Sequence, residues 1–142
     1  MRRVLAVFLG LGFAANGAAM LLAPLLWYGG VPGVADTGPF NPHFVRDIGC
    51  AYVVSGAALI GFAFDRRFGG AALAGAVFLA LHAAVHLWDA AAGRESLDHL
   101  IGDVPAVFVV PALALWVAWP RSRNHKEMNY AQMADRTADR RL

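Results

Sequence analysis

The residues of this sequence that could do chemistry are histidines and aspartates that recur at helical spacing. They form three groups: His43 and Asp47; His82, His86 and Asp89; His99 and Asp103. Side chains four or seven residues apart lie on one face of a helix, so the members of each group can reach the same ligand. Imidazole and carboxylate groups bind zinc, iron or manganese, and they also exchange protons. The pattern therefore predicts a polar site to which several helices contribute.

The formal charge of these groups indicates that something must neutralise them. With ionised carboxylates and a protonated Arg46, the three aspartates Asp47, Asp89 and Asp103 leave an excess of negative charge. A site of low dielectric constant does not tolerate such an excess. Imidazolium ions, protonated carboxyl groups or a bound divalent cation would each restore the balance.

We interpret the groups as a candidate site for a divalent metal. Zinc, iron or manganese is preferred because no thiolate accompanies the histidines. The predicted ligands are His82, His86, Asp89, His99 and Asp103, and the residues predicted to support them or to orient a substrate are His43, Arg46 and Asp47. The sequence contains no His-Glu-x-x-His signature, so no catalytic residue is assigned. A hydrogen-bonded packing network and a proton or quinone site are the alternative interpretations.

The chain that carries these groups is too apolar for an ordinary soluble domain. Of its 142 residues, 58% are hydrophobic and 15% are charged, and the mean hydropathy is +0.51. Stretches near 4–28, 42–64, 69–91 and 97–119 are long enough to cross a bilayer, which takes about 20 helical residues. We therefore predict an all-α protein, with a bundle of four transmembrane helices in residues 1–120 and a polar tail in residues 121–142. This composition excludes a nucleic-acid binder, and the single Cys50 excludes an intramolecular disulfide.

The basic residues predict how this bundle is oriented. If the helices run up-down-up-down, one side carries most of them: Arg2, Arg3, Arg66, Arg67, Arg121, Arg123 and Lys126. The opposite side carries Arg46 and Arg94. Because the cytoplasmic segments of membrane proteins are enriched in Lys and Arg, both termini are predicted to be cytoplasmic. The histidine and aspartate groups then lie in the outer half of the bundle, where an ionisable residue inside a span indicates a functional site.

Two segments carry a resemblance to known proteins. The stretches VPGVADTGPFNPHFVRDIG and LHAAVHLWD resemble a group of small, uncharacterised bacterial four-helix membrane proteins, and the resemblance covers nearly all of residues 1–120. In size and span pattern the chain is also loosely similar to DoxX-like proteins, some of which are linked to quinone-dependent redox complexes. The resemblance implies a multi-pass protein of the bacterial cytoplasmic (inner) membrane and transfers no catalytic residue.

Three classes of function are compatible with these features. The first is redox or metal-assisted chemistry on a small lipid-soluble substrate that enters between helices. The second is a non-catalytic accessory subunit of a larger membrane complex, in which the histidine and aspartate groups form a packing network. The third, a proton-coupled carrier, ranks last because the inner half of the bundle offers little polar surface. The expected partners are the lipid bilayer and either another membrane protein or further copies of the chain.

Overall fold

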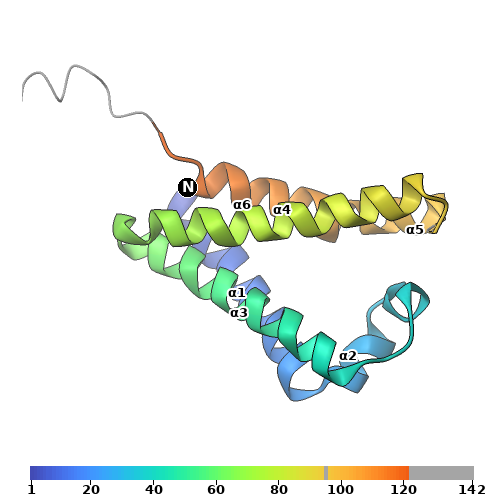
Figure 1. The fold of residues 1–142 in the computed structure, drawn as a ribbon. Coiled ribbons are helices and arrows are strands. Elements are labelled where there is room, and N and C mark those ends of the chain that lie inside the picture. The colour runs from blue at the N-terminus through green and yellow to red at the C-terminus, as the bar shows by residue number, and fades with distance from the viewer. Residues whose placement is uncertain (95, 122–142) are drawn as a thin grey trace, which may run out of the picture.

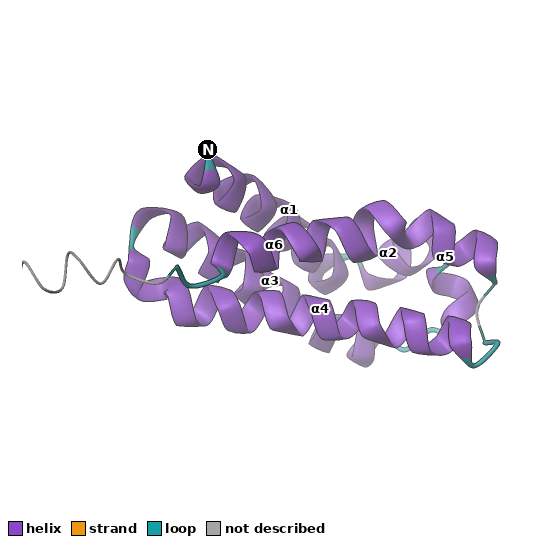
Figure 2. Ribbon diagram, turned by 90° about the horizontal axis from the view of Figure 1, so that it is seen from above, coloured by secondary structure: helices purple, strands orange, loops and turns teal. Residues whose placement is uncertain are grey.

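The computed structural model describes residues 1–94 and 96–121, and the described part of the chain is helical without a strand (Figures 1 and 2). Its elements are α1 (Arg2–Leu22), α2 (Pro24–Gly30), η1 (Val34–Thr37), α3 (Pro42–Phe64), η2 (Arg66–Phe68), α4 (Gly69–Ala91), α5 (Leu97–Asp103), the π-helix η3 (Val104–Val109) and α6 (Val110–Ala118). The predicted tail, apart from residue 121, lies outside the described residues.

Within the part of the chain that the structure describes, four helical segments are long and apolar enough to cross a membrane, as the sequence predicts. They are Arg2–Leu22, Pro42–Phe64, Arg66–Ala91 and Leu97–Ala118. The N-terminus, η2 and residue 121 lie at one end of the molecule, here called the terminal end (Figure 1). The elements α2, η1 and α5 lie at the opposite end, here called the loop end (Figure 1).

The first span ends earlier than the predicted range of 4–28. Helix α1 ends at Leu22, and α2 starts at Pro24 and runs in a new direction (Figure 1). Proline has no N–H to donate to the carbonyl of Met20, and its ring crowds the preceding turn of a continuous helix. The indole N–H of Trp27 then folds back to donate to Asn16 Oδ1, at 2.9 Å. The proline thus converts the end of the predicted span into a separate short helix.

Helices α1 and α3 approach each other so closely that both helices need glycine at the points of contact. A Cβ atom at Gly17 would lie 2.5 Å from the carbonyl oxygen of Gly49, and one at Gly56 would lie 2.5 Å from that of Gly10. The two pairs are one heptad apart on each helix. Small residues allow such contact between membrane helices, where apolar lipid removes the hydrophobic driving force for association.

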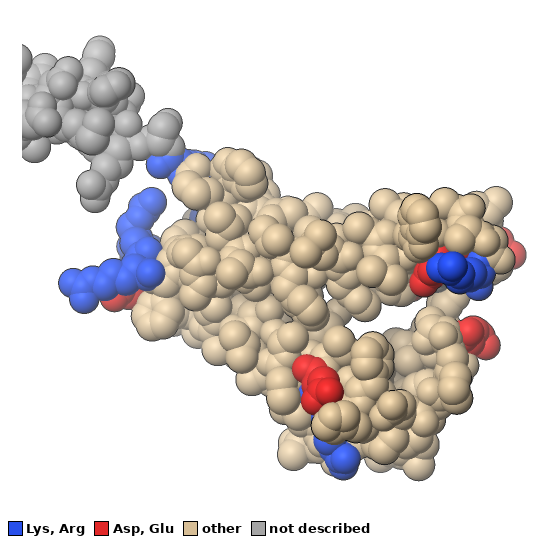
Figure 3. All heavy atoms as spheres, in the orientation of Figure 1, with Lys and Arg blue, Asp and Glu red and all other residues tan. Residues whose placement is uncertain are grey.

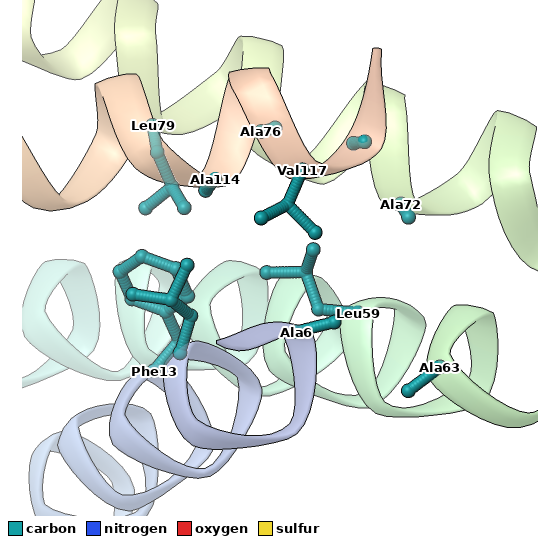
Figure 4. Close-up of a cluster of buried hydrophobic side chains, with 11 residues drawn as sticks. Ala6, Phe13, Leu59, Ala63, Ala72, Ala76, Leu79, Ala114 and Val117 are labelled. Atoms are coloured by element: carbon teal, nitrogen blue, oxygen red, sulfur yellow. The ribbon is translucent and has the colours of Figure 1, made fainter. Parts of the chain in front are cut away.

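The hydrophobic core lies where α1, α3, α4 and α6 meet (Figure 4). Leu59, Leu79 and Val117 are its largest fully buried side chains, and small residues such as Ala72 and Ala114 fill the space between them. Because alanine keeps the helix axes close together, the bundle is compact in this region.

The two halves of the bundle separate toward the loop end. Helix α4 and the α5–α6 segment run side by side (Figure 2), whereas α3 and α2 turn away from them (Figure 1). Figure 3 shows an open crevice between these two arms. Gly33 bridges the arms beyond the crevice, since a Cβ atom there would overlap the ring of His99 in α5. Gly33 also has φ +81°, a conformation that favours glycine.

The contact between α1 and α3 gives a testable prediction. Gly17→Ala should lower the free energy of unfolding by about 1–3 kcal/mol, because the added methyl group collides with the backbone of α3. Gly12→Ala on the same helix is the matched control, since a Cβ there meets nothing within 4 Å. It should be neutral or stabilise by up to about 1 kcal/mol through helix propensity. Thermal unfolding in detergent, followed by circular dichroism, measures both, and an equal effect of the two substitutions would contradict the packing.

Candidate functional site

The site centres on a contact between His86 of α4 and Asp103 of α5. Nδ1 of His86 lies 2.7 Å from Oδ2 of Asp103, and the two side chains are only 18% and 15% exposed. The Asp103 oxygen is itself inaccessible to solvent. A carboxylate in such surroundings must be neutralised, either by a proton of its own or by an imidazolium partner. The structure therefore places the His86 imidazole against a carboxylate that water does not reach, and Asp103 Oδ2 makes no hydrogen bond of regular geometry among the described residues.

A tight turn between α4 and α5 brings the two residues together. Gly93, with φ +69°, reverses the chain after α4. The Ser96 hydroxyl then accepts the N–H of His99 at 3.2 Å and so caps α5. This cap satisfies one of the free N–H groups of the first turn, which explains why a new helix begins here. The antiparallel arrangement places the end of α5 beside His86.

The π-helix η3 follows Asp103 directly. It carries Pro105, and Pro111 stands in the first turn of α6. One extra residue per turn rotates everything that follows by about 100° relative to a continuous α-helix. The direction of Asp103 therefore differs from the one that would be expected if α5 and α6 formed one regular α-helix. Such segments occur frequently at functional sites.

An aromatic chain connects the pair to the core. The His82 and His86 ring centroids are 5.0 Å apart, and His82 lies 6.3 Å from the ring of Tyr52 in α3. Tyr52 also contacts Phe13 of α1 and Phe78 of α4, each at 6.1 Å between centroids. Within the described residues, the Tyr52 hydroxyl makes no hydrogen bond. It is thus a polar group in mid-span without a protein partner among them.

The direction of the His86 side chain follows from these contacts. His82 faces α3 because it meets Tyr52 there, and His86 lies one turn further along the same face of α4. At that level α3 has already turned away (Figure 1). His86 and its partner Asp103 therefore lie closer to the loop end than the contact between His82 and Tyr52.

The remaining predicted ligands of α4 and α5 lie elsewhere. Asp89 is turned toward the surface, where its Oδ1 accepts a hydrogen bond from Arg94 at 2.8 Å. The His99 ring packs against Gly33 at the far end of the crevice. Of the five residues predicted as ligands, the structure brings together His86 and Asp103, with His82 beside them.

The residues predicted to support the ligands lie on the other arm. His43 Nε2 is 3.4 Å from Asp47 Oδ2, and these side chains are 88% and 60% exposed. Nε of Arg46 donates to the carbonyl oxygen of Leu21 at 3.3 Å, which ties α3 to the end of α1. These residues thus lie on the arm opposite His86 and Asp103, because α3 diverges from α4 toward the loop end (Figure 1).

The described residues offer no ready metal centre. Among them, no group of three or more His, Cys, Asp or Glu side chains is arranged to hold a metal ion. The divalent metal stays a prediction from the sequence, and the function proposed below does not depend on it.

Tyr52 is the residue of this site that sequence reasoning missed. It does not titrate near neutral pH and has no charged neighbour at helical spacing, so a search for ligands passes over it. Its position inside the apolar stretch 42–64 was the available signal, because a buried tyrosine hydroxyl needs a partner.

Comparison with the models of known families, with curated proteins and with solved structures found no match to this chain. The resemblance described from the sequence thus stays a prediction.

Replacing the aspartate should cost more stability in the buried pair than in an exposed pair. Asp103→Asn should lower the free energy of unfolding by about 1–3 kcal/mol, because it leaves His86 without its charged partner inside the bundle. Asp89→Asn is the matched control: it breaks an exposed pair, and such pairs contribute no more than about 1 kcal/mol. Chemical unfolding in detergent micelles measures the difference. Equal losses for the two variants would show that the Asp103 contact is no stronger than a surface pair.

Proposed function

We propose that the chain is a multi-pass protein of the bacterial cytoplasmic membrane, with an up-down-up-down bundle and both termini in the cytoplasm. The distribution of charge supports this orientation. Arginines gather at the terminal end (Figure 3), which would face the cytoplasm by the positive-inside rule. At the loop end, Arg46 and Arg94 are each engaged by a protein oxygen. The crevice would then open in the outer half of the membrane.

We further propose that the crevice binds a small lipid-soluble substrate. The observations that carry this proposal are the largely buried His86–Asp103 pair, contributed by α4 and α5, and the opening that separates their arm from the other one. Both arms carry exposed apolar side chains, among them Leu81 at 64%, Ile101 at 67% and Phe44 at 61%. In a bilayer these residues would face acyl chains, so a substrate dissolved in lipid would reach the pair without crossing water.

The groups at the crevice favour a ring-shaped substrate that carries oxygen. His82 and Tyr52 offer flat apolar surfaces, and the Tyr52 hydroxyl can donate a hydrogen bond to a carbonyl or hydroxyl oxygen. His86 can exchange a proton with such an oxygen, while Asp103 holds the imidazole in position. Quinones and related phenols combine these features, and they agree with the redox chemistry predicted from the sequence.

The test is a ligand-dependent shift in unfolding temperature. Ubiquinone-1 is the probe, and 1-methylnaphthalene, a ring without oxygen, is the control. Binding to the folded state stabilises it by about 2.7 kcal/mol at a concentration 100 times Kd. We expect ubiquinone-1 to stabilise the purified protein and 1-methylnaphthalene to do so much less.

Three variants test whether ubiquinone-1 binds beside His86 and Tyr52. His86→Gln and Tyr52→Phe should lose most of the ubiquinone-1 shift, and Tyr52→Phe should keep its stability without ligand because its ring contacts remain. His43→Gln, which changes a histidine at an exposed site, should retain the full shift. If no shift occurs in the unmodified protein and His86→Gln only lowers its stability, the pair is a packing network, and the accessory-subunit interpretation replaces this one.

A further inference from the structure

The terminal end contains an open cavity that takes no part in the site described above. Its volume is about 390 Å³, and its lining residues are Arg2, Leu115, Trp116, Trp119 and Arg121. The two indoles are 48% and 63% exposed. The cavity therefore combines two guanidinium groups with two accessible aromatic rings.

Contacts to the end of α6 hold the Arg2 side chain in place. Its guanidinium donates to the carbonyl oxygens of Trp116, Val117 and Trp119, the last two at 2.8 and 3.5 Å. It also lies over the Trp116 ring, 5.0 Å from the centroid. Cations interact favourably with the last carbonyl groups of a helix, so this arrangement joins the start of α1 to the end of α6.

The cavity has an excess of positive charge. Arg121 and Arg66 are close enough to Arg2 to repel it, and none of the described residues that line the cavity carries a carboxylate. Nε of Arg2 is buried and has no hydrogen-bond partner among the described residues. The carboxylate of Asp65 at this end accepts the backbone N–H of Arg67 within its own turn. An anion in the cavity would thus relieve repulsion that the described chain leaves in place.

We propose that this cavity binds the phosphate headgroup of an anionic phospholipid. Guanidinium groups pair with phosphate through charge-assisted hydrogen bonds, and tryptophan favours the level of the headgroups. A lipid fits better than a free phosphate because the lining belongs to apolar spanning helices whose surface can accommodate acyl chains. Bound there, the headgroup would contact α6 and the first residue of α1 together and strengthen the closure of the bundle.

Native mass spectrometry of the full chain tests the proposal, with dioleoylphosphatidylglycerol and dioleoylphosphatidylcholine as probes. We expect one phosphatidylglycerol to be retained at least about tenfold more tightly than phosphatidylcholine, whose ammonium group two arginines repel. Arg121→Gln removes one guanidinium without disturbing the Arg2 contacts and should weaken retention about tenfold.

Arg67→Gln is the matched control, because Arg67 belongs to η2 at the same end of the molecule but does not line the cavity. It should leave retention within about twofold of the unmodified chain. Equal losses for Arg67→Gln and Arg121→Gln would replace the site with a diffuse basic surface. Retention unchanged in Arg121→Gln would overturn the proposal, as would full displacement of the lipid by millimolar inorganic phosphate.

Discussion

A carboxyl group inside an apolar bundle needs a partner that supplies a proton or a positive charge, and this requirement organises the site of the protein. Asp103 meets it through His86, 2.7 Å away. A proton on the carboxyl group or a positive charge on the imidazole would neutralise the pair. A substrate oxygen placed beside such a pair finds a group that can both give and accept a proton.

The scaffold holds the pair beside an opening through unequal packing. Glycine contacts bring α1 and α3 together over two heptad-spaced positions, and the alanine-rich core joins them to α4 and α6 at the terminal end. At the loop end the contacts that remain between the arms include the one between Gly33 and His99. The bundle is therefore firmly packed where the arginines gather and open where the polar residues lie.

The sequence predicts the spans well because a membrane helix must be long and apolar. The start of α3 has a clear local cause in the sequence: Asn41 caps the helix by accepting the N–H groups of His43 and Phe44, and Pro42 follows in the first turn. The break at Pro24 was missed because the apolar character continues through it, although a proline in mid-span is a visible signal of a helix boundary.

The composition of the site was harder to predict, because spacing tells which residues share a face but not what that face meets. His82, His86 and Asp89 share a face of α4, yet Asp89 turns to Arg94 because it lies at the surface end of the helix. His43 and Asp47 pair with each other because α3 tilts away, a property set by long-range packing. The π-helix after Asp103 shifts the register of the fourth span. The spacing of apolar residues in the sequence does not indicate this π-helix.

The most direct test of the central claim is nitrogen NMR of the imidazole groups in the histidine-labelled protein, reconstituted in lipid nanodiscs. The His86 signals, assigned through a His86→Gln variant, should shift when Asp103 becomes asparagine, because that change removes the carboxylate 2.7 Å from Nδ1. The signals of the exposed His43, which pairs with Asp47 on the other arm, should stay unchanged. If the His86 signals ignore the change at Asp103, the two residues do not interact and the proposed site does not exist.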